Sequence, residues 1–176
     1  MGWHDGRMAT RRLLLLRHAK SSWDEPRLAD HDRPLSGRGR RAARALRDHL
    51  TESDALPELV LCSSAMRTVE TLDGIRAALP PGTTIEIEAA LYAADVDDLL
   101  ARLRRVSEGV GSVMMIGHNP GLEDLATLLV GGGDAAARAG MEAKFPTAAL
   151  AHLSVDGRWH ELGPGVATLD QFWTPR

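Results

Sequence analysis

The sequence predicts an α/β fold, a three-layer α/β/α sandwich with a mostly parallel central sheet and an antiparallel C-terminal edge. Apolar runs of strand length alternate four times with segments of helical spacing, which is typical of a parallel sheet covered by helices on both faces. A turn signal near the C-terminus indicates a hairpin. At 176 residues, the chain has room for one domain with a single sizeable core.

Four short apolar runs, each bounded by turn residues, predict buried strands. Strands that are apolar on both faces are typical of parallel sheets between two helical layers. The predicted strands are Arg12–Leu16, Glu58–Cys62, Thr84–Glu88 and Ser112–Ile116.

The segments between these strands repeat apolar residues at helical spacing. The second of them follows Ser63 and Ser64, which predict an N-cap, and ends before Pro80. The predicted helices are Ser36–Leu50, Ala65–Leu79, Asp95–Val106 and Leu122–Val130.

The two ends of the chain give weaker signals. Asp156 and Gly157, between Ala148–Val155 and Trp159–Leu162, predict the hairpin of the antiparallel edge. The glycine-rich stretch 131–140 predicts a mobile loop.

We expect residues 1–10 to form a flexible tail and residues 11–176 to form one domain. Met8 is an alternative to Met1 as the natural start.

Composition excludes several classes of protein. The chain is 44% hydrophobic and 26% charged, unlike disordered, collagen-like or coiled-coil chains. Its net charge of −3 argues against a nucleic-acid partner. The single cysteine, Cys62, cannot form an internal disulfide, and the apolar run Leu13–Leu16 is too short to cross a bilayer. With no signal-peptide pattern, we expect a cytoplasmic protein without a membrane partner.

Histidine and arginine follow three of the four predicted strands. Arg17 and His18 come after the first strand, Arg67 after the second and His118 after the fourth. Ligands of open α/β sheets bind beyond the carboxyl ends of the strands, so we expect these side chains to converge. Two guanidinium groups and two imidazoles suit a tetrahedral oxyanion such as a phosphoryl group.

A neutral imidazole can attack phosphorus and form a phosphohistidine that water later hydrolyses. The convergent set therefore predicts phosphoryl transfer through a covalent intermediate. We expect structural roles for Cys62 and for four other histidines, while His31 remains open because it lies in the loop after the first strand. The four histidines are His4, His49, His152 and His160.

Four motifs occur in order between Arg12 and Leu162. They are LLLRHAKS at 14–21, RPLSGRG at 33–39, CSSAMRTVET at 62–71 and IGHNP at 116–120. This order resembles the histidine phosphatase superfamily, also called phosphoglycerate mutase-like, and within it the small bacterial SixA phosphohistidine phosphatases.

The resemblance implies a role for each matching residue. His18 would be the phosphoryl acceptor, and Arg17 and Arg67 would clamp the phosphoryl oxygens. His118 would be the second histidine of the pocket, and Arg33 an additional phosphate contact. The resemblance also implies a phosphatase that requires no metal or other cofactor.

One departure from the family bears on the substrate. Many larger relatives place a glutamate before the third helix as proton donor to an alcohol, whereas this chain has Ala89 and Ala90 there. Glu88, Asp24 and Asp32 are possible substitutes, and the donor stays unassigned. Imidazole has a pKa of about 6.5 and leaves more readily than an alkoxide.

The missing acid favours phosphohistidine as the substrate. The short spacing between the pocket residues favours an open pocket, which can admit the phosphohistidine of a protein such as a phosphotransfer domain. Inorganic phosphate would be the product. The alternatives are a broad phosphomonoesterase acting on small phosphate esters, a mutase and a non-catalytic phosphate-binding regulatory module.

Overall fold

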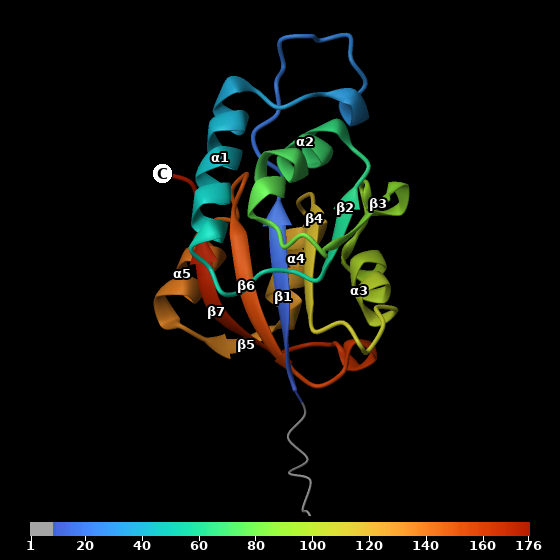
Figure 1. Cartoon of the computed structure of the whole chain (residues 1–176), viewed down its shortest axis with the longest axis vertical. Coiled ribbons are helices and arrows are strands. Elements are labelled where there is room, and N and C mark those ends of the chain that lie inside the picture. The colour runs from blue at the N-terminus through green and yellow to red at the C-terminus, as the bar shows by residue number, and fades with distance from the viewer. Residues whose placement is uncertain (1–8) are drawn as a thin grey trace, which may run out of the picture.

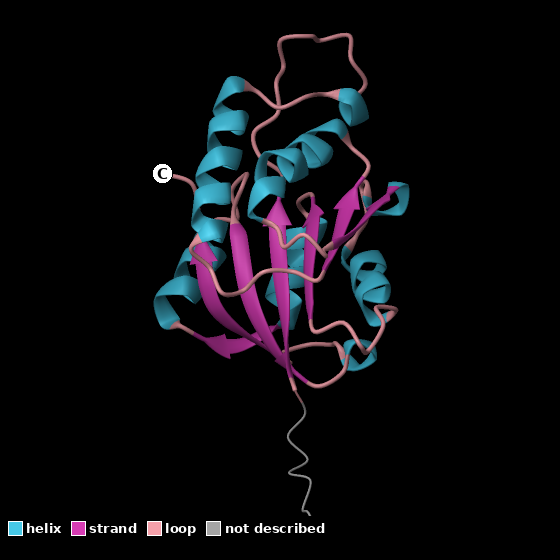
Figure 2. Cartoon of the chain, viewed as in Figure 1, coloured by secondary structure: helices cyan, strands magenta, loops and turns pink. Residues whose placement is uncertain are grey.

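The computed structural model describes residues 9–176, whose seven strands form one sheet in the order β3-β2-β4-β1-β6-β7-β5 (Figures 1 and 2). Neighbouring strands β3, β2, β4 and β1 are parallel, and β6 runs antiparallel to both β1 and β7. The α/β fold class is therefore confirmed. The antiparallel strand β6 lies inside the sheet and not at its edge, where the sequence predicted it. The strands are β1 (Thr10–Arg17), β2 (Leu59–Ser63), β3 (Thr84–Glu88), β4 (Ser112–Gly117), β5 (Val130–Gly133), β6 (Leu150–Asp156) and β7 (Ala167–Trp173).

Within the described residues, five α-helices cover the sheet. The helices are α1 (Gly37–Thr51), α2 (Met66–Ile75), α3 (Val96–Arg104), α4 (Gly121–Leu129) and α5 (Ala135–Ala143). Four short 3-10 helices, η1 (Asp30–Asp32), η2 (Arg76–Ala78), η3 (Ala89–Leu91) and η4 (Trp159–Glu161), lie in the connections. No helix among residues 9–176 is long and apolar enough to span a membrane.

Strand β1 shows how the two layers are built. Leu14 and Leu16 pack in one core with residues of α1 and α2, whereas Leu13 and Leu15 pack in the other with residues of α3, α4 and α5. Successive side chains of a strand point to opposite faces, so the four-leucine run serves both cores. The three-layer arrangement follows from this alternation.

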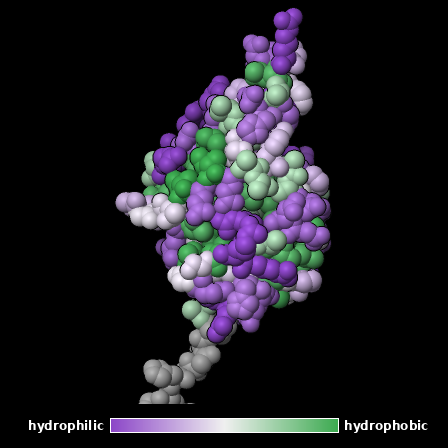
Figure 3. All heavy atoms as spheres, turned by 90° about the vertical axis from the view of Figure 1, so that its right-hand side faces the viewer, coloured by the Kyte–Doolittle hydropathy of each residue, from purple (hydrophilic) through white to green (hydrophobic). Residues whose placement is uncertain are grey.

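Strand β3 has the predicted bounds but is not buried. It is the edge strand next to β2, and Ile87 is 50% exposed. Figure 3, which views the side of the molecule where β3 and α3 lie, shows hydrophobic spheres scattered among hydrophilic ones. The prediction of a buried strand was wrong here because sheet position, rather than local pattern, decides burial.

The predicted C-terminal hairpin is also wrong in its second strand. Trp159–Leu162 does not form a strand, and β6 pairs instead with β7. The buried Trp159 indole Nε1 donates to the carbonyl of Val110 at 2.7 Å, and the Glu108 carboxylate accepts the backbone N–H of Trp159 at 3.0 Å. These contacts hold this segment in the 3-10 helix η4.

The glycine-rich stretch 131–140 is not a loop. Gly131, Gly132 and Gly133 belong to β5, which pairs with β7, and residues 135–140 belong to α5. Gly133 has a φ of +127°, which favours glycine, and Asp134 caps α5 by accepting the Ala137 N–H at 2.8 Å. Of the predicted N-terminal tail, residues 1–8, including Met8, lie outside the described residues, and Thr10 is the first residue of β1.

Candidate active site

Strands β1, β2 and β4 end at the same edge of the sheet and bring the predicted residues together. His18 follows β1, His118 follows β4, and the backbone N–H of His18 donates to Gly117 at 3.1 Å. The two imidazole rings lie 5.2 Å apart between centroids. Arg67, in the first turn of α2, is close enough that its charge lowers the pKa of both histidines.

His18 is buried, and its orientation is set by one hydrogen bond. Its Nδ1 lies 2.7 Å from the carbonyl oxygen of Ala19, which accepts only from a protonated nitrogen. The lone pair of the neutral ring is therefore at Nε2. Burial, with smaller contributions from the charges of Arg67 and Arg17, lowers the His18 pKa to about 4, so the ring is neutral near pH 7.

His118 lies against the end of β2. Its Nε2 is 2.7 Å from the hydroxyl oxygen of Ser63, which accepts the Ala65 N–H at 3.4 Å. Nδ1 is buried and has no hydrogen-bond partner among the described residues. Burial and then the neighbouring His18 lower the pKa of His118 to about 3, so this ring is also neutral near pH 7.

The two arginines differ in how they are held. Arg17 donates from Nη1 to the carbonyl of Phe145 at 3.0 Å, while its buried Nε has no partner among the described residues. Arg67 donates to the backbone oxygen of Asp30 at 2.7 Å and to its carboxylate at 3.0 Å. Arg17 Nε and His118 Nδ1 are thus two buried, unpartnered groups, and a bound oxyanion would supply them with acceptors.

Asp30 is a residue of the cluster that no sequence motif singles out. Its carboxylate accepts from Arg67, from the Tyr92 hydroxyl at 2.6 Å and from Arg33 at 3.1 Å. The hydrogen bond from Tyr92 and the contacts with Arg67 hold the Asp30 pKa near 2, so the carboxylate is ionised. Asp24 and Asp32 lie in the same loop, and sequence spacing alone does not distinguish Asp30 from them.

Arg33 is buried and contacts Asp30, not the two histidines. Each of its three side-chain nitrogens already donates a hydrogen bond, to Ser22, Asp30 and Ser21. The exposed Trp23 ring lies 3.2 Å from its guanidinium carbon. These contacts hold the 21–30 loop and Asp30, and a direct phosphate contact by Arg33 stays a prediction.

The carboxylates considered as proton donors lie outside this cluster. Glu88 accepts from Arg102 Nε at 2.9 Å, and this hydrogen bond lowers the Glu88 pKa. Asp24 is exposed, and Asp32 is exposed and pairs with His31. Among residues 9–176, no hydrogen bond joins any of the three to His18 or His118.

His31 lies on the rim of the cluster. Its Nε2 is 2.9 Å from the Ser64 hydroxyl, and its ring packs edge-on against Tyr92 at 4.8 Å between centroids. Residues 9–176 contain no group of three His, Cys, Asp or Glu side chains placed to share a metal ion.

The other candidate residues have structural contacts. Burial raises the pKa of the Cys62 thiol to about 12, so it stays protonated. His49 faces His152, and His160 pairs with Glu108 at 2.8 Å. His4 lies outside the described residues.

Residues 13–106 match the family model of the histidine phosphatase superfamily, branch 1. The chain belongs to this superfamily. An uncharacterised protein of Mycobacterium tuberculosis is 38% identical over 165 residues, covering 92% of this chain and all of its own length. This histidine phosphatase is therefore a hydrolase of phosphoryl groups.

Solved structures share its fold and overall size. A protein assigned as the phosphohistidine phosphatase SixA from Agrobacterium tumefaciens is 30% identical, with a TM-score of 0.80 over 94% of this chain and 98% of its own. The protein histidine phosphatase SixA complexed with tungstate is 25% identical, with a TM-score of 0.74 over 93% of this chain and 97% of its own. A mycobacterial glucosyl-3-phosphoglycerate phosphatase, 18% identical with a TM-score of 0.62 over 96% of this chain and its own full length, shows the shared fold alone.

Proposed function

We propose that this histidine phosphatase hydrolyses phosphohistidine on a protein substrate, with His18 as the phosphoryl acceptor. The observation that carries the proposal is the state of the carboxylate in the cluster. Asp30 is held ionised by Arg67, Arg33 and Tyr92, and so it is a poor proton donor. A substrate whose leaving group needs no strong acid fits this site best.

In the first step, the Nε2 lone pair of His18 attacks phosphorus, and the bond from phosphorus to the substrate nitrogen breaks. The electron pair leaves with the substrate imidazole, which takes a proton from water. The hydrogen bond from His18 Nδ1 to Ala19 supports Nε2 as the attacking atom. The low pKa of His18 keeps that lone pair available near pH 7.

In the second step, water attacks phosphorus, and the bond to His18 Nε2 breaks with its electron pair returning to that nitrogen. The attacking water releases a proton to solvent, which replaces the one taken up in the first step, and inorganic phosphate leaves. The same donors stabilise both transition states, because each spreads negative charge over the phosphoryl oxygens. Arg17 and Arg67 supply the positive charge, and the buried Nε of Arg17 supplies a donor without another partner.

His118 supplies a further donor in this scheme. The Ser63 hydroxyl accepts the Ala65 N–H and can direct its own proton to His118 Nε2. The neutral ring then carries its proton on Nδ1, the buried nitrogen without a partner. We assign this N–H to a phosphoryl oxygen.

The surroundings of the cluster support a protein substrate. Trp23, Leu28 and Met66 are large hydrophobic side chains that are 70%, 40% and 42% exposed. Trp23 stacks on Arg33, and Met66 directly precedes Arg67. Exposed aromatic and methionine side chains are enriched where proteins meet.

A phosphomonoesterase acting on small esters is the second candidate, because the Asp30 side chain is 54% exposed and leaves the cluster accessible to small molecules. The two functions are separated by incubating the protein with a histidine-phosphorylated phosphotransfer domain and, separately, with p-nitrophenyl phosphate, and measuring phosphate release from each. Faster phosphate release from the protein supports the proposal.

Comparable or faster release from the aryl ester would overturn it in favour of the general phosphatase. Release from neither, with tungstate still bound, would favour a phosphate-binding regulatory module. The Ala90→Glu variant adds a check, since Ala90 is exposed in η3 and takes the place of the acid found in larger relatives. We expect faster turnover of alkyl phosphates, and no gain would count against the leaving-group argument.

A further inference from the structure

A groove of about 580 Å³ lies beside the candidate active site, between the first half of α1, residues 144–147 and the C-terminal residues 174–176. No aspartate or glutamate lines it, although the chain as a whole is acidic. Five exposed cationic side chains line it: Lys20, Arg38, Arg41, Lys144 and Arg176.

Both long walls of the groove are built on the segments that hold the active-site residues. Lys20 is two residues from His18, and its carbonyl accepts the Ser36 N–H at 2.9 Å at the start of α1. Gly39 of α1 lies so close that a Cβ there would overlap this carbonyl oxygen. On the other wall, Pro146 follows Phe145, whose carbonyl accepts from Arg17. A molecule in the groove would therefore lie next to the phosphoryl site.

The cations of the groove are available to a ligand. Among the described residues, none of the five forms an ion pair with a carboxylate. By contrast, Arg47 of the same helix pairs with Asp48, and Arg40 donates to the carbonyl of Leu35. Several unpaired like charges along one groove sum to a positive potential that attracts anionic partners.

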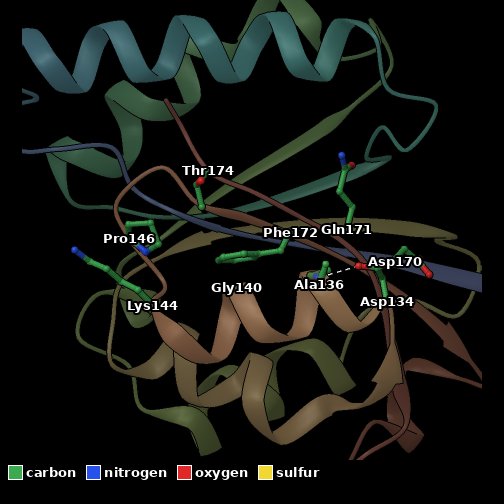
Figure 4. A pocket seen from close by; sticks show the side chains of 10 residues that line it. Asp134, Ala136, Gly140, Lys144, Pro146, Asp170, Gln171, Phe172 and Thr174 are labelled. Atoms are coloured by element: carbon green, nitrogen blue, oxygen red, sulfur yellow. Dashed lines mark hydrogen bonds between the residues drawn. The ribbon is translucent and has the colours of Figure 1, made fainter.

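The charge of this surface changes from basic to acidic with distance from the groove. Lys144, Pro146 and Thr174 also line a neighbouring hollow, which Asp134 and Asp170 line as well. Figure 4 shows Lys144 and Pro146 at one end of that hollow and the two aspartates at the other. The basic end is the one that adjoins the active site.

We propose that this groove, defined by its five cationic residues, docks an acidic segment of the protein substrate next to its phosphohistidine. The inference rests on the proposed function and names the chemistry of the partner. Acidic side chains beside the phosphorylated histidine would meet Lys20, Arg38 and Arg41 while the phosphoryl group reaches His18. The pairing selects among phosphoproteins and speeds their encounter with the enzyme.

The test uses two fluorescent peptides of equal length, each with one histidine, flanked by aspartates and glutamates in one and by serines and glutamines in the other. Fluorescence anisotropy measures the binding of both to the intact protein. We expect the acidic peptide to bind about tenfold or more tightly than the neutral one, with the preference weakening as salt is added.

The double variant Arg38→Glu/Arg41→Glu should abolish this preference. A control on the same helix is Arg44→Glu, which reverses one charge instead of two, at a residue lining a different hollow, between α1 and α2. Turnover of p-nitrophenyl phosphate should be unchanged in both variants, which shows that the fold and the phosphoryl site are intact.

The same peptides, phosphorylated on histidine with phosphoramidate, separate this inference from the proposed function. Equal binding and equal hydrolysis of the two peptides would overturn the docking site and leave the phosphatase proposal standing. Preferential binding of the acidic peptide without hydrolysis of either would support the docking site and count against phosphohistidine as substrate. Tighter binding of an inorganic polyphosphate of equal charge would overturn a site for a protein segment.

Discussion

Among residues 9–176, two pairs of histidines lie close together, and we assign chemistry to one of them. His18 and His118 have ring centroids 5.2 Å apart, and His49 and His152 have centroids 5.6 Å apart. Burial is the first cause of a lowered pKa in all four. By proximity and pKa alone, the two pairs look alike.

The surroundings separate them. The first pair lies beside Arg17 and Arg67, and Nδ1 of His118 has no partner among the described residues. In the second pair, the two Nε2 atoms face each other at 3.4 Å, and the His49 ring stacks on Trp173. Unpartnered donors in a positive field therefore mark the candidate site, whereas burial and proximity do not.

The largest expected difference between the pairs is in turnover. His18→Ala removes the attacking nitrogen and should lower phosphate release about a thousandfold or more, whereas His152→Ala should change it less than about threefold. Trapping of the phosphorylated protein after a short reaction with labelled substrate gives a second readout. Substantial turnover by His18→Ala would contradict the covalent mechanism.

The next largest loss of activity should come from an arginine beside His18 and His118. Arg67→Ala should lower kcat/KM about a hundredfold to a thousandfold, because a donor to the transition-state charge is lost. The control is Arg12→Ala, beside the second pair, where Arg12 lowers the His152 pKa and donates to Asp54. Equal losses in the two variants would mean that general destabilisation, not charge at the site, explains the result.

A smaller effect should come from the serine that orients His118. Ser63→Ala removes the hydroxyl at 2.7 Å from Nε2 and should lower kcat about tenfold, with KM for p-nitrophenyl phosphate changed less. Its neighbour Ser64 contacts His31 instead, so Ser64→Ala is the matched control and should stay near wild type. If the two variants behave alike, His118 is not positioned through Ser63.

The pH dependence of activity is the next test. Below its pKa of about 4, His18 is protonated and has no lone pair at Nε2. As the pH falls through 4, kcat/KM for p-nitrophenyl phosphate should therefore fall, and it should show no loss from His18 between pH 6 and 5. A fall in kcat/KM near pH 6.5, the ordinary histidine pKa, would contradict the buried, neutral state of this ring.

The last test concerns stability and does not involve turnover. The pKa of His152 is about 4 in the folded protein and about 6.5 for an ordinary histidine, so between these values the unfolded chain binds more protons. Its contribution to the free energy of unfolding is full above about pH 6.5 and is lost as the pH falls towards 4, by up to about 3 kcal/mol. His152→Gln should flatten the urea-measured stability over this window without moving the acid limb of activity, and an unchanged slope would contradict the shift.

Most of the candidate site can be predicted from the sequence because of how parallel sheets are built. Arg17, His18, Arg67 and His118 each lie at or just beyond the carboxyl end of a strand, and β1, β2 and β4 are parallel neighbours. In such a sheet these ends share one edge, so residues about fifty positions apart meet there. Local apolar patterns were therefore enough to predict both the helical layers and this convergence.

The tertiary structure alone decided the rest. Asp30 is distinguished from the other aspartates of its loop by the side chains of Arg67 and Tyr92, which reach it from two other elements. The strand next to β6 is β7, because Trp159 finds its partners near Val110 and holds the intervening segment in a 3-10 helix.

The basic groove likewise joins three segments that are distant in the sequence, namely the first half of α1, residues 144–147 and the C-terminus. The local sequence determines strands, helices and the residues that end them, because backbone preference and apolar spacing act within a few positions. Contacts between distant residues form only when the layers pack. These contacts decide which carboxylate an arginine keeps ionised and which cations share a groove.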